Sequence, residues 1–170
     1  MPVTEPMSDG AYSFRPVETR DLSLLGRWLK TPEVLRWWGD TAEEAELLRQ
    51  DIDNPRMTMR IVAFKDRPFA YVQDYDVRSW PQPHLAALPA GARAIDSFIG
   101  EPEMIGRGHG SIYLRILAHR LMAEGAPVVA IDPDLDNARA QRAYRKAGFR
   151  DVKIVETEPG PALLMLFEGQ

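Results

Sequence analysis

The chain has 170 residues, of which 45% are hydrophobic and 27% are charged, and it contains no cysteine. These values are typical of a soluble globular chain, and no stretch is apolar for long enough to span a membrane. The lack of cysteine excludes disulfides, thiolate zinc sites and catalysis through a cysteine nucleophile. The formal net charge of -4 argues against nucleic acid as the main partner, because phosphate binding requires a basic surface.

The first ten residues are polar and include two prolines. We expect a flexible tail over residues 1–10, followed by a single domain over residues 11–170. The tail has neither the basic region nor the apolar region of a signal peptide, which predicts a cytoplasmic protein.

The first third of the chain is predicted to be mainly helical after one short strand over residues 12–16. We expect Thr19 to cap a helix whose apolar face is formed by Leu22, Leu25, Trp28 and Leu29. Pro32 ends that helix, and a second amphipathic turn over residues 33–38 ends at Gly39. Thr41 and Glu44 have the spacing of a capping box, which predicts a third helical segment to about residue 52.

The middle of the chain is predicted to be rich in strands. Residues 57–64 are apolar and β-branched, residues 66–68 favour a hairpin turn, and residues 69–77 form the partner strand. Residues 81–91 are rich in Pro, Ala and Gly and predict a loop. A further strand is expected over residues 92–99.

A glycine-rich turn over residues 106–110 is expected to open an amphipathic helix that ends at Gly125. A short apolar strand over residues 128–131 follows, then a helix over residues 137–147 that Gly148 closes. Residues 152–155 and 162–167 predict a final pair of strands. Helices inserted among strands indicate an α/β (α+β) fold with a mixed sheet.

The glycine-rich turn lies between a predicted strand and an apolar helix. Glycines let the backbone close around phosphate oxygens, and a helix start offers unpaired N–H groups and the positive end of the helix dipole. The turn lacks the Lys-Ser/Thr of a P-loop and is not the G-x-G-x-x-G that opens a dinucleotide-binding unit. It predicts either a pyrophosphate cradle or a turn whose glycines serve only tight geometry.

A second motif follows one strand later and has the form N-x(6)-Y-x(3)-G-F, from Asn137 to Phe149. Together the two motifs resemble the acetyl-CoA binding core of the GCN5-related N-acetyltransferases (GNAT). The resemblance implies a mostly antiparallel central sheet, flanked by helices and splayed at the acetyl-CoA site. The family has Gln or Arg where this chain has Ile105, which removes one side chain and leaves the backbone donors in place.

The resemblance also implies which residues hold acetyl-CoA, the co-substrate. Backbone N–H groups of the turn would bind the pyrophosphate, and the pantetheine arm would lie beside the end of the strand over residues 92–99. The residues implied in cofactor binding are Phe98, Ile99, Gly106, Arg107, Gly108, His109, Gly110, Ser111, Asn137 and Tyr144. Asn137 would bind the pantetheine, cap its helix, or do both.

Further segments look like the aminoglycoside 6'-N-acetyltransferases: residues 34–39 (VLRWWG), 71–75 (YVQDY), 94–100 (AIDSFIG) and 131–133 (IDP). The resemblance implies that Asp96 and Asp132 bind a cationic small-molecule amine, with Asp96 as the base, directly or through water. It implies that Tyr144 protonates the leaving thiolate. For Asp132, which precedes a proline, a purely structural role at a strand end is the alternative.

Aromatic and polar side chains near these segments are candidates for binding the acceptor, because flat aromatic faces stack on sugar rings and attract cations. The candidate acceptor-binding residues are Trp37, Gln73, Asp74, Tyr75, Trp80, Asp96 and Asp132. For each aromatic residue the alternative is core packing. His84, His109 and His119 lack metal-ligand spacing, so we expect structural or solvent-facing histidines and no metal.

Two alternatives keep the cofactor and change the acceptor: a hydroxylated lysine in siderophore biosynthesis, or the N-terminus of a ribosomal protein or other peptide. The siderophore group is expected to have a histidine near Asp96, where this chain reads Asp96-Ser97-Phe98. A third alternative is a module that binds acetyl-CoA without transferring its acetyl group. Neither nucleic acid nor membrane is an expected partner, and the chain is expected to be a monomer or a homodimer.

Overall fold

The computed structural model of the chain describes residues 10–169. These residues form two compact units, one made of residues 10–73 and 97–107, the other of residues 74–96 and 108–169. Residues 1–9, which make up most of the expected tail, lie outside the described residues. The expectation of a single domain stays a prediction.

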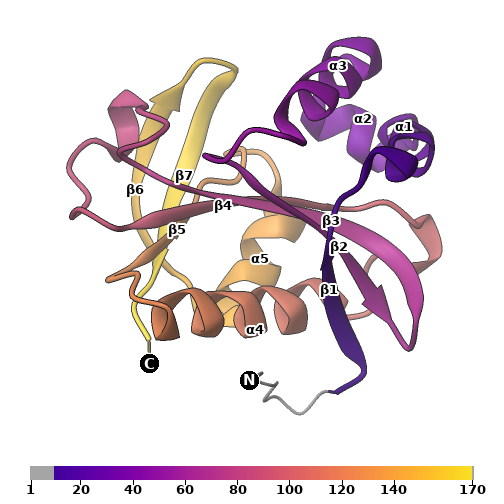
Figure 1. Ribbon diagram of the computed structural model, residues 1–170. Helices are drawn as coiled ribbons and strands as arrows, with labels where there is room; N and C mark the ends of the chain where they lie inside the picture. The colour runs from indigo at the N-terminus through magenta and orange to yellow at the C-terminus, as the bar shows by residue number, and fades with distance from the viewer. Residues whose placement is uncertain (1–9, 170) are drawn as a thin grey trace. The chain divides into compact units, whose positions relative to one another are not determined.

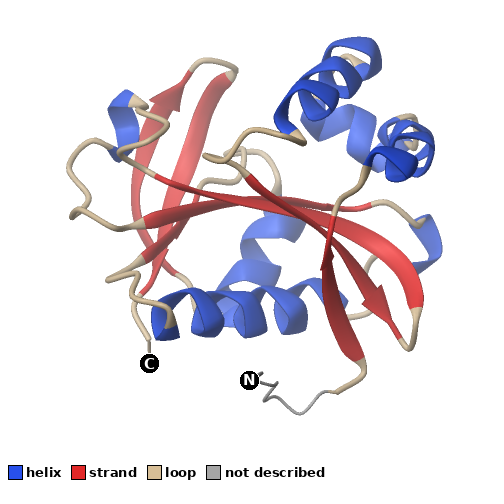
Figure 2. Ribbon diagram, in the orientation of Figure 1, coloured by secondary structure: helices blue, strands red, loops and turns tan. Residues whose placement is uncertain are grey.

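Within residues 10–169, seven strands form one mixed sheet in the order β1-β2-β3-β4-β5-β7-β6 (Figure 2). β4 and β5 are parallel, whereas β1–β2, β5–β7 and β6–β7 are antiparallel. The strands are β1 (Tyr12–Pro16), β2 (Thr58–Phe64), β3 (Arg67–Asp76), β4 (Arg93–Ile99), β5 (Val129–Ile131), β6 (Arg150–Thr157) and β7 (Gly160–Phe167). The α-helices are α1 (Leu22–Leu29), α2 (Pro32–Trp38), α3 (Thr41–Asp51), α4 (His109–Ala123) and α5 (Ala138–Ala147). This architecture confirms the predicted fold class.

The first unit contains the β1–β2 pair and three short helices. Tyr12 pairs with Phe64 at one end of the β1–β2 ladder, and Pro16 pairs with Arg60 at the other. Helices α1, α2 and α3 follow β1 in the chain and lie together in Figure 1. Trp28 of α1 is fully buried and belongs to the core of this unit.

Two helix starts differ from the sequence prediction. A 3-10 turn over Thr19–Asp21 precedes α1, and its N-cap is Glu18 rather than Thr19. Asp40, not Thr41, is the N-cap of α3, because its carboxylate accepts the Glu43 N–H at 2.9 Å. The expected cap of α3 was therefore one residue too late, whereas α1 itself begins after Asp21, two residues beyond the expected cap Thr19.

The hairpin turn between β2 and β3 lies at Lys65 and Asp66, one residue earlier than predicted. Both residues have positive φ, at 50° and 68°. Two consecutive left-handed residues are typical of the type I′ turn, whose twist matches that of a two-residue hairpin. Arg67 and Pro68, which the sequence placed in the turn, are the first residues of β3.

The second unit contains α4 and α5 together with β5, β7 and β6 (Figure 1). The predicted apolar face of α4 is buried, with Leu114, Leu117 and Leu121 each at most 2% exposed. α5 ends at Gly148, which has a φ of +116° and so takes the left-handed conformation that glycine favours. The predicted closure of this helix is confirmed.

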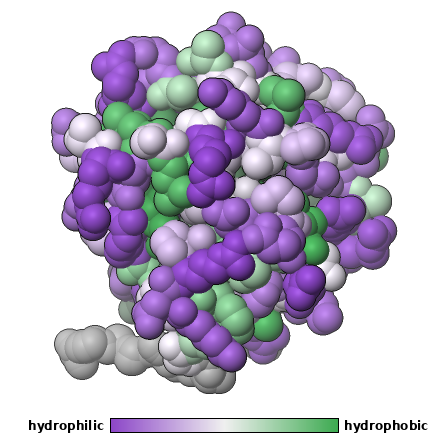
Figure 3. All heavy atoms as spheres, turned by 90° about the vertical axis from the view of Figure 1, so that its right-hand side faces the viewer, coloured by the Kyte–Doolittle hydropathy of each residue, from purple (hydrophilic) through white to green (hydrophobic). Residues whose placement is uncertain are grey.

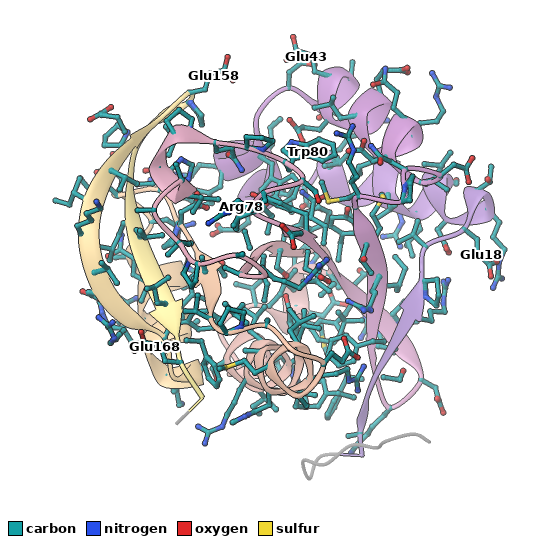
Figure 4. All side chains as sticks on the ribbon, turned by 60° about the vertical axis from the view of Figure 1, so that its left-hand side comes forward. Glu18, Glu43, Arg78, Trp80, Glu158 and Glu168 are labelled. Carbon is teal, nitrogen blue, oxygen red and sulfur yellow. The ribbon has the colours of Figure 1, made fainter. Side chains whose placement is uncertain are left out.

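The β6–β7 hairpin is longer than predicted, and it turns at Glu158 and Pro159. Figure 4 shows Glu158 at its tip. β6 ends the strand order, and six of its eight residues are exposed. An exposed edge strand has no clear alternation of apolar and polar residues, so the pattern did not mark its ends.

Figure 3 shows one face, which is mainly hydrophilic, with hydrophobic side chains in a vertical band and in smaller separate patches. Within residues 10–169, none of the helices is both long and apolar enough to cross a membrane.

Candidate active site

Asp96 and Asp132 occupy matching positions on two neighbouring parallel strands. Arg93 of β4 pairs with Val129 of β5, and Ala94 pairs with Ala130. The ladder ends there, and Asp96 and Asp132 each stand two residues beyond the last pair. Because the carboxyl ends of parallel strands lie at the same edge, the two carboxylates emerge on the same side of the ladder. The strand register therefore gathers the two acidic side chains that the sequence singled out.

Tyr75, at the end of β3, lies close to both carboxylates. Burial raises the pKa of its phenol, and the negative charges of Asp96 and Asp132 raise it further. The side-chain amide of Gln82 donates a hydrogen bond to the Tyr75 hydroxyl at 2.7 Å. Tyr75 is therefore a protonated, anchored phenol beside the two acids.

Tyr144, on α5, is close enough to the same two carboxylates for their charges to act on its phenol. Burial raises the pKa of its phenol, and the neighbouring Tyr113, Asp96 and Asp132 add to the effect. Its hydroxyl has no hydrogen-bond partner among residues 10–169, while its ring lies 6.3 Å from that of Phe149. Tyr144 therefore keeps its proton at neutral pH and has an O–H group free to donate.

The glycine-rich turn leads into α4. Gly106 and Gly108 both have positive φ, at 78° and 88°, and Gly108 is the N-cap of α4. No side chain caps this helix start, and the Ser111 hydroxyl donates to the Gly108 carbonyl at 2.9 Å. Arg107 is exposed. The start of α4 is thus suited to binding an anion through its backbone.

The anion-binding helix start and the acidic pair belong to one neighbourhood. Tyr113 lies in the second turn of α4 and is close enough to Tyr144 to contribute to its raised pKa. Asp96 and Asp132 also raise the pKa of Tyr144, so Tyr144 is near both the carboxylates and Tyr113 of α4.

Asn137 is the N-cap of α5. Its side-chain oxygen accepts the Ala140 N–H at 3.2 Å. The structure therefore gives Asn137 the capping role that the sequence predicted, and binding of pantetheine stays a prediction.

His84, which the sequence predicted to be structural or solvent-facing, lies against the acidic pair. The Nε2 atom of His84 lies 2.6 Å from Oδ2 of Asp132. His84 comes from the short 3-10 turn Pro83–Leu85, inside the loop over residues 81–91. His84 belongs to no metal-binding or catalytic sequence motif, so its place in the site depends on how the loop folds.

The three aromatic residues proposed for the acceptor fall in different surroundings. Trp80 packs near Tyr75, with ring centroids 6.2 Å apart, and Figure 4 shows it in the loop after β3, near Arg78. Trp37 donates to Glu33 at 3.2 Å and lies under the guanidinium of Arg36.

Within the first unit, Trp38 rather than Trp37 contacts the end of β4. Its ring centroid lies 4.9 Å from that of Phe98, edge to face, and the ring centroid of Tyr71 lies 5.3 Å from that of Phe98. Gln73 accepts a hydrogen bond from the Tyr71 hydroxyl at 2.6 Å. Phe98, predicted to line the cofactor site together with Ile99, is thus held in an aromatic cluster.

Asp74 forms a buried ion pair instead of facing solvent. It is 1% exposed, and Nε of Arg93 donates to its carboxylate at 2.8 Å. A carboxylate already neutralised by a guanidinium offers little to a cationic acceptor, so the function proposed for the site leaves Asp74 out. The described residues hold no group of three or more His, Asp or Glu side chains suited to a metal ion.

Residues 18–157 match the family model described as an acetyltransferase (GNAT) domain. The chain belongs to the GNAT family. It is therefore an N-acetyltransferase, as the two sequence motifs predicted.

Several relatives of this GNAT chain are known. It is 28% identical to an aminoglycoside N(6')-acetyltransferase type 1 of Klebsiella pneumoniae, over 94% of this chain and 84% of the relative. A solved aminoglycoside acetyltransferase bound to coenzyme A and kanamycin is 26% identical, with a TM-score of 0.82 over 92% of this chain and 94% of that one. An uncharacterized protein of Bacillus halodurans shares the fold, with a TM-score of 0.85 over 92% and 83% of the two chains at 24% identity.

Proposed function

We propose that this GNAT chain transfers the acetyl group of acetyl-CoA to a primary amine of an aminoglycoside. The observation that carries the proposal is the pair of carboxylates, Asp96 and Asp132, beside the protonated phenol of Tyr144. Relatives of this chain that are named aminoglycoside acetyltransferases support the choice of acceptor.

The residues at the start of α4 fit coenzyme A. Two left-handed glycines and a helix start without a side-chain cap offer backbone N–H groups to a pyrophosphate. Acetyl-CoA supplies the activated acetyl group as a thioester.

The acidic pair binds and prepares the acceptor. Ammonium groups of the acceptor form charge-assisted hydrogen bonds with Asp96 and Asp132. Asp96 takes the proton that the reacting amine must lose, directly or through one water molecule. The freed nitrogen then forms the new C–N bond as the C–S bond breaks, and backbone N–H groups near Phe98 or Ile99 stabilise the oxyanion.

Tyr144 completes the proton balance. Its O–H group donates to the departing sulfur, and the phenolate recovers a proton from solvent or from the site. The neighbouring negative charges keep the phenol protonated before the reaction and also make it a weaker acid, so its proton moves only as negative charge builds up on the departing sulfur.

The test is release of coenzyme A thiol from acetyl-CoA across a panel of amines. The panel contains kanamycin, a polyamine, a hydroxylated lysine and a short peptide, and NMR of the product locates the acetyl group. We expect kanamycin to be acetylated most efficiently, at its 6'-nitrogen. Acetylation of the peptide alone would contradict the proposal.

One observation keeps a second acceptor in the panel. Siderophore-type enzymes are expected to have a histidine near the segment of Asp96, and His84 lies in the candidate site, although it comes from a loop and contacts Asp132. Preference for the hydroxylated lysine over kanamycin would assign the chain to that acceptor class.

A further inference from the structure

His84 is a buried titratable residue that the proposed reaction does not use. Its side chain is 5% exposed, and its Nε2 atom lies 2.6 Å from Oδ2 of Asp132, whose side chain is 21% exposed. The distance is that of a short, charge-assisted hydrogen bond. Asp132 therefore reaches solvent, whereas His84 stays inside the protein.

The loop that carries His84 is held by contacts on both sides of the residue. Gln82 donates to the Tyr75 hydroxyl at 2.7 Å, and a guanidinium nitrogen of Arg78 donates to the Leu88 carbonyl at 3.2 Å. Leu85, next to His84, is 1% exposed. The imidazole is thus presented from a fixed segment.

The contact with His84 makes the two carboxylate oxygens of Asp132 different from each other. Oδ2 lies within hydrogen-bond distance of Nε2 of His84, while Oδ1 has no hydrogen-bond partner among the described residues. A carboxylate oxygen can accept from an ammonium group while its twin is occupied by another donor. Because His84 is nearly buried, Asp132 is the member of the pair that can touch an acceptor.

We propose that His84 is a positioning residue: it donates its Nε2–H to Oδ2 of Asp132 and so holds Oδ1 toward the acceptor's ammonium group. The inference rests on the proposed function, because the acceptor amine is the ligand of Oδ1. It assigns His84 to binding of the acceptor and gives it no part in binding acetyl-CoA.

The first test compares two substitutions of similar size with kanamycin as the acceptor. His84→Leu removes the donor, and His84→Gln places an amide N–H near the position of Nε2. We expect His84→Leu to raise the KM for kanamycin about tenfold, the usual effect of losing a hydrogen bond to a charged group. kcat and the KM for acetyl-CoA should stay within about twofold, and His84→Gln should restore most of the loss.

A double-mutant cycle separates positioning from general packing. In an Asp132→Asn background, His84→Leu should no longer change the KM for kanamycin, because the group that it orients has lost its charge. An equal effect in both backgrounds, or an unchanged KM in the single variant, would overturn the proposal. Circular dichroism melts confirm that each compared variant is folded.

A second readout needs neither a variant nor turnover. Nitrogen-15 NMR of the wild-type chain reports which nitrogens of the His84 imidazole carry a proton. The proposal requires a proton on Nε2, with or without one on Nδ1, and a proton on Nδ1 alone would overturn it. If the wild-type chain acetylates no amine of the panel, the proposed function fails, while this measurement still decides whether His84 donates to Asp132.

Discussion

At the scale of single residues, Tyr144 is the side chain whose hydroxyl group can be removed with little change in packing. Tyr144→Phe keeps the ring beside Phe149 and deletes only the O–H group. If that group protonates the leaving sulfur, kcat should fall about 100-fold, the usual effect of losing a general acid. The KM for acetyl-CoA should change by no more than about twofold, and thiol release at saturating substrates measures both constants.

The pH dependence follows from the raised pKa of Tyr144. Burial and the neighbouring Tyr113, Asp96 and Asp132 place this pKa above the ordinary 10.0 of a tyrosine. The phenol therefore stays protonated as the pH rises toward 10, and its ionisation should cause no loss of kcat in that range.

An unchanged kcat in Tyr144→Phe would show that another group, or water, protonates the thiolate.

Asp21 carries a stability prediction in the first unit. Arg15 donates to both of its oxygens, at 2.7 and 2.8 Å, and these bonds lower the pKa of Asp21 despite its burial. A lowered folded-state pKa adds stability above the unfolded value, and this stability is lost as pH falls through the folded value. Asp21→Asn should cost about 1–2 kcal/mol at neutral pH, reduced by screening because Arg15 is 37% exposed.

Urea unfolding at neutral and strongly acidic pH checks this difference, which should disappear at the acidic value. Asp151→Asn is the matched control, because Asp151 also pairs with an arginine through two hydrogen bonds but is half exposed. The control should change stability little at either pH. Equal effects of the two substitutions would mean that burial of Asp21 does not matter.

At the scale of elements, the end of β4 is fixed by the close approach of Gly100 to α1. A Cβ atom at Gly100 would lie 2.1 Å from the indole ring of Trp28, whose Nε1–H donates to Glu101 at 2.9 Å. Gly100→Ala must displace this buried ring, so we expect a loss of about 3 kcal/mol in the free energy of unfolding.

Gly26→Ala is the control for Gly100→Ala, since Gly26 lies within α1 and a Cβ there meets no atom within 4 Å. It should stabilise the chain by up to about 1 kcal/mol, because alanine is the better helix former. Urea unfolding of both variants compares the two. If Gly100→Ala were as stable as the wild type, the contact with Trp28 could not be what fixes the end of β4.

The start of α5 carries a prediction that separates two roles of one side chain. Asn137 accepts the Ala140 N–H, and Asn137→Ala should lower stability by about 1 kcal/mol. Asn137→Ser restores a capping oxygen without the amide group. If Asn137 also binds pantetheine, the serine variant should regain stability but keep a raised KM for acetyl-CoA. Recovery of both properties would leave Asn137 with capping alone.

At the scale of the whole molecule, the sequence predicted the elements and the family better than it predicted local contacts. Hydrophobic periodicity located α4 and α5, and the glycine turn together with N-x(6)-Y-x(3)-G-F identified the GNAT core. Element ends were less predictable. Neighbouring residues such as Asp40 and Thr41 can both cap a helix, and the one with the better geometry is chosen only in the folded chain.

The candidate site shows the same limit. Asp96 and Asp132 were found because motifs surround them, whereas the partners of nearby side chains depend on pairings between distant segments. Asp74 meets Arg93 across 19 residues, and His84 meets Asp132 across 48. Hydrophobic periodicity carries no information about such pairs. The sequence therefore did not show that Arg93 neutralises Asp74 or that His84 contacts Asp132.

The net charge of -4 leads to a prediction for the whole molecule once the charges are located. Asp74 is buried against Arg93, and Asp96 and Asp132 are the acids that we propose attract a cationic acceptor. Raising the salt concentration from about 0.1 to about 1 M shortens the screening length from about 10 to about 3 Å. The KM for kanamycin should therefore rise several-fold while kcat at saturating kanamycin stays constant. Asp132→Asn should give a smaller rise, and a KM independent of salt would mean that the acidic pair does not attract the acceptor.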